Sequence, residues 1–309
     1  MTTPGRWRSL GSEARHAPVL TAEVVSMLSP RPGGVYVDCT VGLGGHAAAL
    51  LAAGAGRVIG LDRDAGALDQ TRERLAANAA STAGRLELVH ADYRDLASVL
   101  ETRGITAVDG VLADLGVSSW QLDDASRGFS FRNAGPLDMR MDRSRGRTLG
   151  EWLASVDEPT LAGVIRDFGE ERHARRVAAA IVRARDAGRL SHTAELASVV
   201  RRAAGSGRWQ RIDPATRTFQ ALRIAVNDEL TGLDTFLERA VASLKARARL
   251  VVIAFHSLED RVVKQTFRRL ATAGTVSLVT RRPLTTSDEE IALNPRARSA
   301  RLRTVERAA

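Results

Sequence analysis

The sequence has 309 residues, of which 44% are hydrophobic and 26% charged, a composition that is typical of globular proteins and excludes a fibrous or disordered chain. One cysteine cannot form an internal disulfide, and the six histidines lack the spacing of a zinc site, so we expect no metal. Residues 1–15 are polar and basic, and no run of eighteen apolar residues is present. We therefore expect neither a signal peptide nor a membrane span, and a cytoplasmic protein.

Basic charge is distributed unevenly along the chain. Residues 1–125 contain 11 arginines and 15 acidic residues, whereas the whole chain carries a net charge of +9, so the basic excess lies beyond residue 125. Concentrated basic charge favours a polyanionic partner, and nucleic acid before membrane, because no strongly basic amphipathic helix with an aromatic face is present. A compositional bias of the genome would explain the preference for arginine over lysine, but not the uneven distribution.

Short apolar runs alternate with helical patterns in the first third of the chain. The runs predict strands at 34–38, 57–62, 86–90 and 108–114, and the segments between them predict helices at 45–53, 65–77 and 96–100. This alternation predicts βαβ units and a parallel sheet that helices cover on both faces. Asp38, Asp62 and Asp114 end three of the strands, at the edge where open α/β sheets bind ligands.

The strand pattern stops near residue 121. Residues 126–148 are rich in Arg, Gly, Asp and Pro and predict a long ordered loop. Helical patterns follow, before Gly205-Ser-Gly207 interrupts them, at 149–155, 158–168, 170–186 and 193–203. A long helix is expected over residues 215–243.

Strand patterns return in the last part of the chain, which predicts a strand at 249–255, a helix at 257–270 and a strand at 275–280. The last thirty residues contain prolines and many arginines, and we expect them to form a tail on the surface. The pattern as a whole predicts a sheet domain, residues 1–123 and 218–309, with a helical domain, residues 124–217, inserted after the fourth strand.

A glycine-rich segment, Asp38-Cys-Thr-Val-Gly-Leu-Gly-Gly-His46, joins the first predicted strand to its helix. Glycines let the backbone approach a ligand closely, and the start of a helix supplies free N–H donors. Asp62 is placed to accept hydrogen bonds from ribose hydroxyls. NAD(P) and S-adenosylmethionine both fit this arrangement. Asp38 favours S-adenosylmethionine, because a carboxylate repels a pyrophosphate and attracts an ammonium or a sulfonium.

Longer motifs extend from His16 to Arg303, nearly the whole chain, and resemble the MraW family of rRNA small-subunit methyltransferases. They are the segments 38–46, 91–96, 114–123, 127–131, 135–142, 169–172, 214–220, 226–230, 255–261 and 294–300. The sequence departs from the family pattern at Asp213, where histidine is usual, and at residues 244–250, which replace a Pro-Gly-Gly turn.

The resemblance implies an α/β fold, a Rossmann-like class I methyltransferase sheet with an inserted helical domain. It implies transfer of a methyl group from S-adenosyl-L-methionine to N4 of a cytidine in the decoding region of 16S rRNA, within the small ribosomal subunit. A homo-oligomer is compatible with the sequence, which does not determine the oligomeric state. The cofactor contacts implied by the family are the loop residues Gly44, Gly45 and His46, the ribose acid Asp62, Tyr93 beside the adenine, and Asp114 and Gln121 near the methyl donor.

Asp114 is the best-placed acid to accept an N–H bond from the target amine, although a role in orienting the cofactor alone fits its position as well. Asp138, Arg140 and Asp142 lie in the polar loop that should wall the substrate side, and His256 should face the same cleft. The charges of that loop fit an internal ion-pair network equally well. Basic surface on the helical domain and the tail is expected to hold RNA phosphates.

Two functions from other classes stay open on the sequence. An NAD-dependent oxidoreductase would require a proton donor that faces the nicotinamide. A non-enzymatic RNA-binding factor on a degenerate methyltransferase fold would lack a complete cofactor loop, whereas the loop in this chain is complete.

Overall fold

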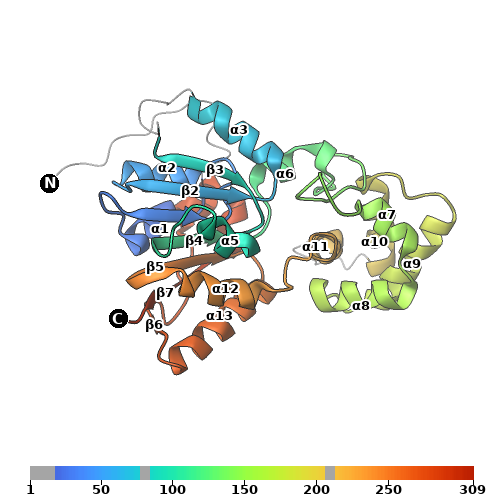
Figure 1. The fold of residues 1–309 in the computed structure, drawn as a ribbon. Coiled ribbons are helices and arrows are strands. Elements are labelled where there is room, and N and C mark those ends of the chain that lie inside the picture. Colours follow the sequence, from blue (N-terminus) through green and yellow to red (C-terminus); the bar gives the residue numbers. More distant parts are fainter. Residues whose placement is uncertain (1–17, 77–83, 206–212) are drawn as a thin grey trace. The chain divides into compact units, whose positions relative to one another are not determined.

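The computed structural model describes residues 18–76, 84–205 and 213–309, so our predictions for residues 1–15 and for Gly207 lie outside the described residues. The chain forms two compact units, one of Met1–Gly116 with Gly232–Ala309 and one of Val117–Thr231 (Figure 1). The domain boundaries that we expected, near residues 124 and 217, both lie inside the second unit.

The first unit is built on one seven-stranded sheet with the order β3-β2-β1-β4-β5-β7-β6. Neighbouring strands from β3 to β5 run parallel, whereas β7 pairs antiparallel with both β5 and β6. The α/β, Rossmann-like sheet expected from the sequence is confirmed. The strands are β1 (Val35–Asp38), β2 (Arg57–Asp62), β3 (Leu86–His90), β4 (Val108–Asp114), β5 (Leu244–Ala254), β6 (Val276–Leu278) and β7 (Arg301–Arg307).

Successive residues of the central strands point to opposite faces of the sheet. Val37 and Val111 belong to the core on one face, and their sequence neighbours Tyr36 and Leu112 belong to the core on the other. Because helices bury both faces, the strands are apolar throughout (Figure 1). One core includes α5 (Leu96–Glu101), α12 (Leu233–Ala242) and α13 (Ser257–Thr272), and the other includes α1 (Thr21–Leu28), α2 (Gly45–Ala52) and α3 (Ala65–Ala76).

Our prediction that the last thirty residues form a tail on the surface was wrong, because the final part of this segment forms β7 inside the sheet. Leu302 and Val305 are fully buried. Arg303 donates from Nε to Oδ1 of Asp260 on α13 at 2.6 Å, so its charge is neutralised where it is buried. Arginines alternate with apolar residues in this strand, so its composition resembles that of a solvated segment. The ion pair with Asp260 explains how the strand can bury Arg303.

The single long helix expected over residues 215–243 was also wrong. The structure has two helices there, α11 (Pro214–Asn227) and α12, in different units. Asp228 ends α11 with a left-handed φ of 49°, and Gly232 precedes α12 with a φ of 73°. A residue in this conformation cannot continue a right-handed helix, so the chain changes direction between them.

Strand β5 begins at Leu244, five residues before the expected start. The β4–β5 register is irregular there, since Val108 pairs with Leu244 and Gly110 with Arg249. Arg247 has a φ of 61°, as expected of a bulge. The segment that departs from the family's Pro-Gly-Gly turn is therefore the irregular first part of this strand.

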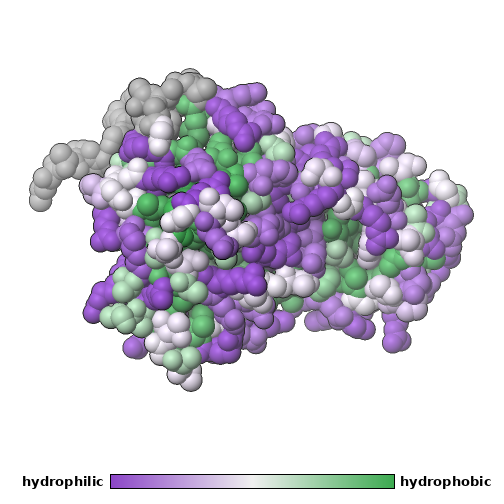
Figure 2. Space-filling view, in the orientation of Figure 1, coloured by the Kyte–Doolittle hydropathy of each residue, from purple (hydrophilic) through white to green (hydrophobic). Residues whose placement is uncertain are grey.

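The second unit is helical, apart from the long loop over residues 128–148. Its core includes Leu149, Ile165, Val177, Leu196 and Leu222, one from each of its longer helices. Hydrophilic residues cover most of the molecular face seen in Figure 2. No helix among the described residues is long and apolar enough to cross a membrane. The helices are α6 (Ser119–Asp123), α7 (Leu149–Ser155), α8 (Glu158–Gly169), α9 (Ala174–Asp186), α10 (Thr193–Ala204) and α11.

Candidate active site

The glycine loop between β1 and α2 is fixed to both neighbouring strands. Cys39 donates its N–H to Leu112 O on β4, and Val41 donates to Leu61 O on β2, each at 2.8 Å. Gly44 precedes α2 with a φ of 78°, and a Cβ at this position would lie 2.8 Å from Cγ2 of Thr71. The loop therefore requires glycine here for its backbone conformation and for its packing.

Asp62 organises the loop from the end of β2. Its Oδ2 accepts a hydrogen bond from Gly42 N and its Oδ1 accepts one from Asp64 N, both at 2.8 Å. Burial raises the pKa of Asp62 to about 6, although these two backbone bonds favour the charged form. Each oxygen keeps a second lone pair, so the carboxylate can still accept hydrogen bonds from a ribose diol.

Three ionisable side chains meet where β1 and β4 end. Asp38 is fully buried, and its Oδ1 accepts a bond from Thr40 N at 3.2 Å. His46, the second residue of α2, is 5% exposed, and its Nε2 lies 3.5 Å from Asp114 Oδ2. The hydroxyl of Thr40 accepts a bond from Asp114 N at 2.7 Å, which fixes the backbone of that acid. Two carboxylates and one imidazole thus share a small volume at the edge of the sheet.

The pKa values of this cluster reflect burial and mutual attraction. Burial raises the pKa of Asp38 to about 7, against the opposing attraction of His46. Burial alone would lower the pKa of His46, but its contact with Asp114 and the charge of Asp38 outweigh this effect and raise it. The two carboxylates therefore favour the protonated, positively charged form of the His46 imidazole.

Unpartnered polar atoms indicate that this cluster is built for a ligand. Asp38 Oδ2 and Asp114 Oδ1 are buried and have no hydrogen-bond partner within residues 18–76, 84–205 and 213–309. Buried acceptors of this kind are costly unless another molecule supplies the donor. Among the described residues, a Cβ at Gly42 would meet nothing closer than Thr40 O at 3.9 Å.

S-adenosylmethionine fits these residues group by group. Its ammonium suits the unpartnered oxygen of Asp38, and its ribose diol suits Asp62. Its carboxylate suits the start of α2, where no side chain caps the helix. NAD(P) fits less well, because its pyrophosphate would lie close to Asp38.

Tyr93 follows β3, in a short 3₁₀ helix that spans Tyr93–Asp95. Its ring packs on Phe236 with 4.6 Å between centroids, and the Arg94 guanidinium lies 5.6 Å from the ring centroid. The side chain is 7% exposed, and burial raises its pKa. Contact of this ring with an adenine stays a prediction, since most of its surface is in the core.

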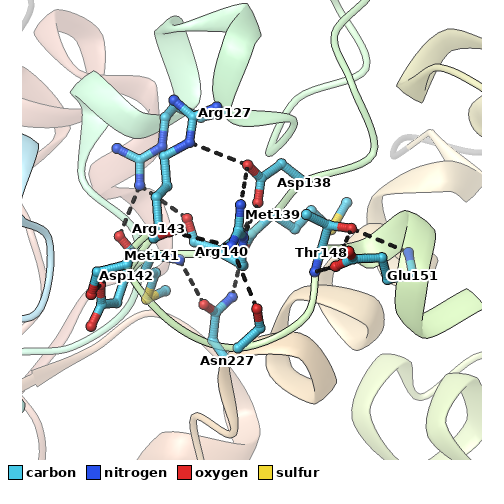
Figure 3. A network of polar contacts seen from close by, with 12 residues as sticks. Arg127, Asp138, Met139, Arg140, Met141, Asp142, Arg143, Thr148, Glu151 and Asn227 are labelled. Carbon is cyan, nitrogen blue, oxygen red and sulfur yellow. Dashed lines mark hydrogen bonds and ion pairs between the residues drawn. The ribbon is translucent and has the colours of Figure 1, made fainter.

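The long loop of the second unit contains an internal polar network (Figure 3). Asp138 accepts bonds from Arg140 Nε at 2.7 Å and from Arg143 Nε at 3.2 Å. Burial opposes ionisation of Asp138, but these bonds outweigh it and lower the pKa. Asp142 accepts a bond from the Ser144 hydroxyl at 2.6 Å. The charges of this loop thus bind one another, and any contact of Asp138, Arg140 or Asp142 with substrate stays a prediction.

Asn227 holds this loop against α11. Its Nδ2 donates to Met139 O and its Oδ1 accepts from Met141 N, each at 2.7 Å (Figure 3). Met139 has a φ of 60°, a strained backbone conformation that these bonds stabilise. Buried Arg127 adds bonds to the carbonyls of Arg140 and Met141. The loop is therefore ordered, as we expected from its composition.

The two remaining predicted residues have clear structural roles. Gln121 closes a capping box at the start of α6, where its Oε1 accepts a bond from Ser118 N at 3.0 Å. His256 precedes α13, and its Nδ1 accepts a bond from Glu259 N at 3.3 Å. Whether Gln121 also reaches the cofactor, or His256 the substrate, stays a prediction.

Sequence reasoning missed two residues that shape the site. Thr40 is a fixed position of the recognised motif, but the motif gave no sign that its hydroxyl binds Asp114 N. Thr71 lies on α3, where its hydroxyl donates to Gly42 O at 2.5 Å. An isolated threonine in a helix carries no sequence signal of such a contact, because the contact joins residues that only the fold brings together.

The chain is similar over nearly its whole length to proteins of known name. One relative, ribosomal RNA small subunit methyltransferase H of Citrifermentans bemidjiense, is 46% identical, and the match covers 94% of this chain and 98% of that protein. The protein of the same name from Anaeromyxobacter dehalogenans is 49% identical, with 96% and 99% covered. A putative methyltransferase from Streptococcus mutans, solved in complex with SAH, is 10% identical over 94% of this chain and 98% of that one, with a TM-score of 0.43.

A match to a whole protein family settles the class of the chain. Residues 13–308 match the MraW methylase family, which is nearly the full length of the sequence. The methyl donor is S-adenosylmethionine, in agreement with the loop, the ribose acid and the unpartnered carboxylates. This chain belongs to the MraW methylase family.

Proposed function

We propose that the chain methylates N4 of a cytidine in the decoding region of 16S rRNA, within the small ribosomal subunit and hence in the cytoplasm. Two relatives that match over their whole length are named as small-subunit rRNA methyltransferases. The observation that carries the proposal is the pair of unpartnered carboxylate oxygens, on Asp38 and Asp114, beside a glycine loop of a methylase family. One of these acids is available for the cofactor and the other for the amine.

The exocyclic amine of cytosine is a weak nucleophile, because its lone pair is delocalised into the ring. When bound, S-adenosylmethionine supplies a methyl group on a positively charged sulfur, and the amine must lose one proton on accepting it. The Asp114 carboxylate, which is 22% exposed at the end of β4, can accept an N–H bond from that amine, which favours the pyramidal form and stabilises the developing positive charge. Alignment of the two reactants supplies roughly 7–11 kcal/mol in favourable cases.

The ribose contact can be tested by calorimetry. Asp62→Ala should weaken S-adenosylmethionine binding at least about tenfold, because it removes charge-assisted bonds worth roughly 1.5–3 kcal/mol each and frees Gly42 N. Asp69→Ala on the exposed side of α3 is the matched control, since its carboxylate binds only Arg72 there. Unchanged affinity in Asp62→Ala would remove this acid from the cofactor site.

Arginines gather at one end of the helical unit. Arg176 Nη2 donates to Ala204 O at 2.8 Å, which places the start of α9 beside the end of α10. Arg201 Nη2 lies 2.7 Å from Oδ2 of Asp213, at the start of α11. We call the exposed set at these helix ends the arginine end, and its members are Arg172, Arg175, Arg176, Arg201, Arg202 and Arg217.

The arginine end carries more positive charge than its acids neutralise. Asp213 pairs with Arg201, and buried Glu171 lies 4.0 Å from Arg217. Arg172, Arg175 and Arg202 have no carboxylate within ion-pair distance in the described part of the chain. Exposed guanidinium groups without a carboxylate partner suit RNA phosphates. A contact between a guanidinium and a phosphate fixes the position of the RNA but does not depend on the RNA sequence. We infer that this end binds rRNA.

Salt dependence and paired variants test this inference. The double variant Arg172→Gln/Arg175→Gln should weaken rRNA binding about fivefold or more near physiological salt, and it should reduce the slope of log affinity against log salt by about 1.4–1.8. Arg183→Gln/Arg189→Gln, nearer the other end of α9, removes the same charge and is the control. Equal effects of the two double variants would mean that only net charge matters.

The activity itself is tested by transfer of a labelled methyl group. Naked 16S rRNA and small subunits from cells that lack this protein are the two substrates, and 23S rRNA is the control. The proposal expects label in small-subunit RNA alone. Because a base stacked in RNA must be turned out to meet the donor, an unstructured target segment should be methylated faster than a paired one.

A further inference from the structure

We propose that His46 is a positioning residue for Asp114, in that its ring attracts one carboxylate oxygen of Asp114 and so fixes the orientation in which the carboxylate faces the target amine. The inference rests on the proposed function for its effect on rate, but the contact between the two side chains can be tested without any RNA. It assigns to His46 a role beyond its place in the cofactor loop.

The position of the imidazole is determined by the backbone around it. Gly45, the residue before it, packs so closely on Pro18 that an added Cβ would lie 2.8 Å from the proline ring. Gly44 fixes the start of α2 in the same way against Thr71. His46 itself is 5% exposed, and neither of its ring nitrogens has a hydrogen-bond partner among the described residues. The ring therefore cannot turn out to solvent without moving the start of the helix.

The groups that face this ring are acidic on every side. Asp114 ends β4, with Oδ2 3.5 Å from Nε2, and Asp38 ends the adjacent strand β1. Glu290 on α14 (Asp288–Leu293) adds a third, weaker attraction, while its Oε1 accepts a bond from Leu20 N at 2.8 Å. A neutral imidazole would leave buried Asp38 and half-buried Asp114 close together without a cation. The charged ring is the arrangement that balances them.

Holding one oxygen orients the whole carboxylate. The terminal torsion of an aspartate is soft, so a carboxylate with no partner samples a broad range of orientations. In this site Thr40 fixes the backbone of Asp114, and His46 attracts Oδ2, whereas Oδ1 is buried without a partner among the described residues. Loss of the imidazolium should therefore reduce the fraction of enzyme in which the Asp114 carboxylate is correctly oriented. Such a change lowers kcat more than it raises KM for the cofactor.

Kinetics of His46→Gln test the role in the reaction. Glutamine keeps an N–H donor but no charge, and we expect a single-turnover rate about tenfold lower at saturating S-adenosylmethionine, with KM for the cofactor within about threefold. The wild-type rate should fall on the alkaline side, as pH rises through the raised pKa of His46, and the variant should lack this fall. If saturating cofactor restored the rate of His46→Gln to that of wild type, His46 would only contact the cofactor. That result would overturn the proposal.

Nuclear magnetic resonance tests the contact itself and separates its failure from a wrong substrate. The His46 ring signal, assigned with His46→Gln, should titrate at lower pH in Asp114→Asn than in wild type, because the facing negative charge is gone. The ring signal of exposed His192 is the control, and it should be the same in both proteins. An unchanged pKa of His46 would refute the ion pair even if rRNA methylation is confirmed, whereas a shifted pKa with no rRNA methylation would overturn only the proposed substrate.

Discussion

Replacing Asp114 by asparagine should lower the single-turnover rate about tenfold to a hundredfold at saturating cofactor, which corresponds to about 1.4–2.7 kcal/mol of transition-state stabilisation. Asparagine keeps the shape and one acceptor oxygen but removes the charge that faces the amine as it becomes cationic. The affinity for S-adenosylmethionine should stay within about threefold. Single-turnover kinetics and calorimetry on the same preparation measure both quantities.

The alternative for Asp114 is that it only orients the cofactor. In that case affinity falls, saturating cofactor restores the rate, and a rate within about threefold of wild type excludes a catalytic charge. Asp109→Asn, in the same strand, is the matched control. Asp109 accepts bonds from Val35 N and Lys245 Nζ, far from the carboxyl end of β4, so its loss should lower stability and leave the rate unchanged.

Replacing Asp38 by asparagine should weaken S-adenosylmethionine binding by about thirtyfold or more and at the same time stabilise the free protein. The carboxylate is fully buried with one oxygen unpartnered among the described residues, so its charge favours a cationic ligand and costs free energy without one. Asparagine can still accept the bond from Thr40 N. Calorimetry gives the affinity, and thermal unfolding without cofactor gives the stability.

The stability effect should depend on pH in a defined direction. Burial raises the pKa of Asp38 to about 7 from an ordinary value near 4, so the folded chain holds this proton more tightly than the unfolded chain. The protonated Asp38 therefore stabilises the folded state below about pH 4. This contribution to the free energy of unfolding is lost as pH rises from about 4 to 7. Asp38→Asn should match wild type in Tm near pH 4 and exceed it at pH 8. Equal Tm values at both pH values would mean that the buried charge is compensated within the protein.

The same acid predicts how wild-type binding responds to pH. Protonation of Asp38 below about pH 7 removes a negative charge from the pocket, so affinity for the positively charged cofactor should fall between pH 8 and pH 6. Asp62, with a pKa raised to about 6, contributes to the same fall at its lower end.

Much of the first unit could be predicted from the sequence, because its strands are buried on both faces. A buried parallel strand is a short apolar run, and β1, β2 and β4 follow this pattern closely and end in aspartate. Strand β7 has no such pattern. Its arginines are tolerated because β5 and β6 flank it and Asp260 binds Arg303, and neither condition is visible in the sequence around it.

The residues of the candidate site were predictable as a set, but their contacts were not. Spacing and resemblance pointed to Gly44, His46, Asp62 and Asp114 at the carboxyl ends of the strands. The ion pair of His46 with Asp114 joins residues far apart in the chain, and local patterns carry no information on it. The same holds for Asn227, whose two bonds to the loop at Met139 and Met141 depend on how α11 packs.

The central claim is that this methylase acts on the exocyclic amine of one cytidine in 16S rRNA. The most direct test is to treat small subunits from cells that lack the protein with the enzyme and isotopically labelled S-adenosylmethionine, then map the methylated nucleoside by mass spectrometry of RNA fragments. The account predicts one labelled nucleoside, N4-methylcytidine, in a decoding-region fragment, and no label with Asp38→Asn at low cofactor concentration. Label on a ring carbon, on a ribose hydroxyl, or in the large-subunit RNA would contradict it.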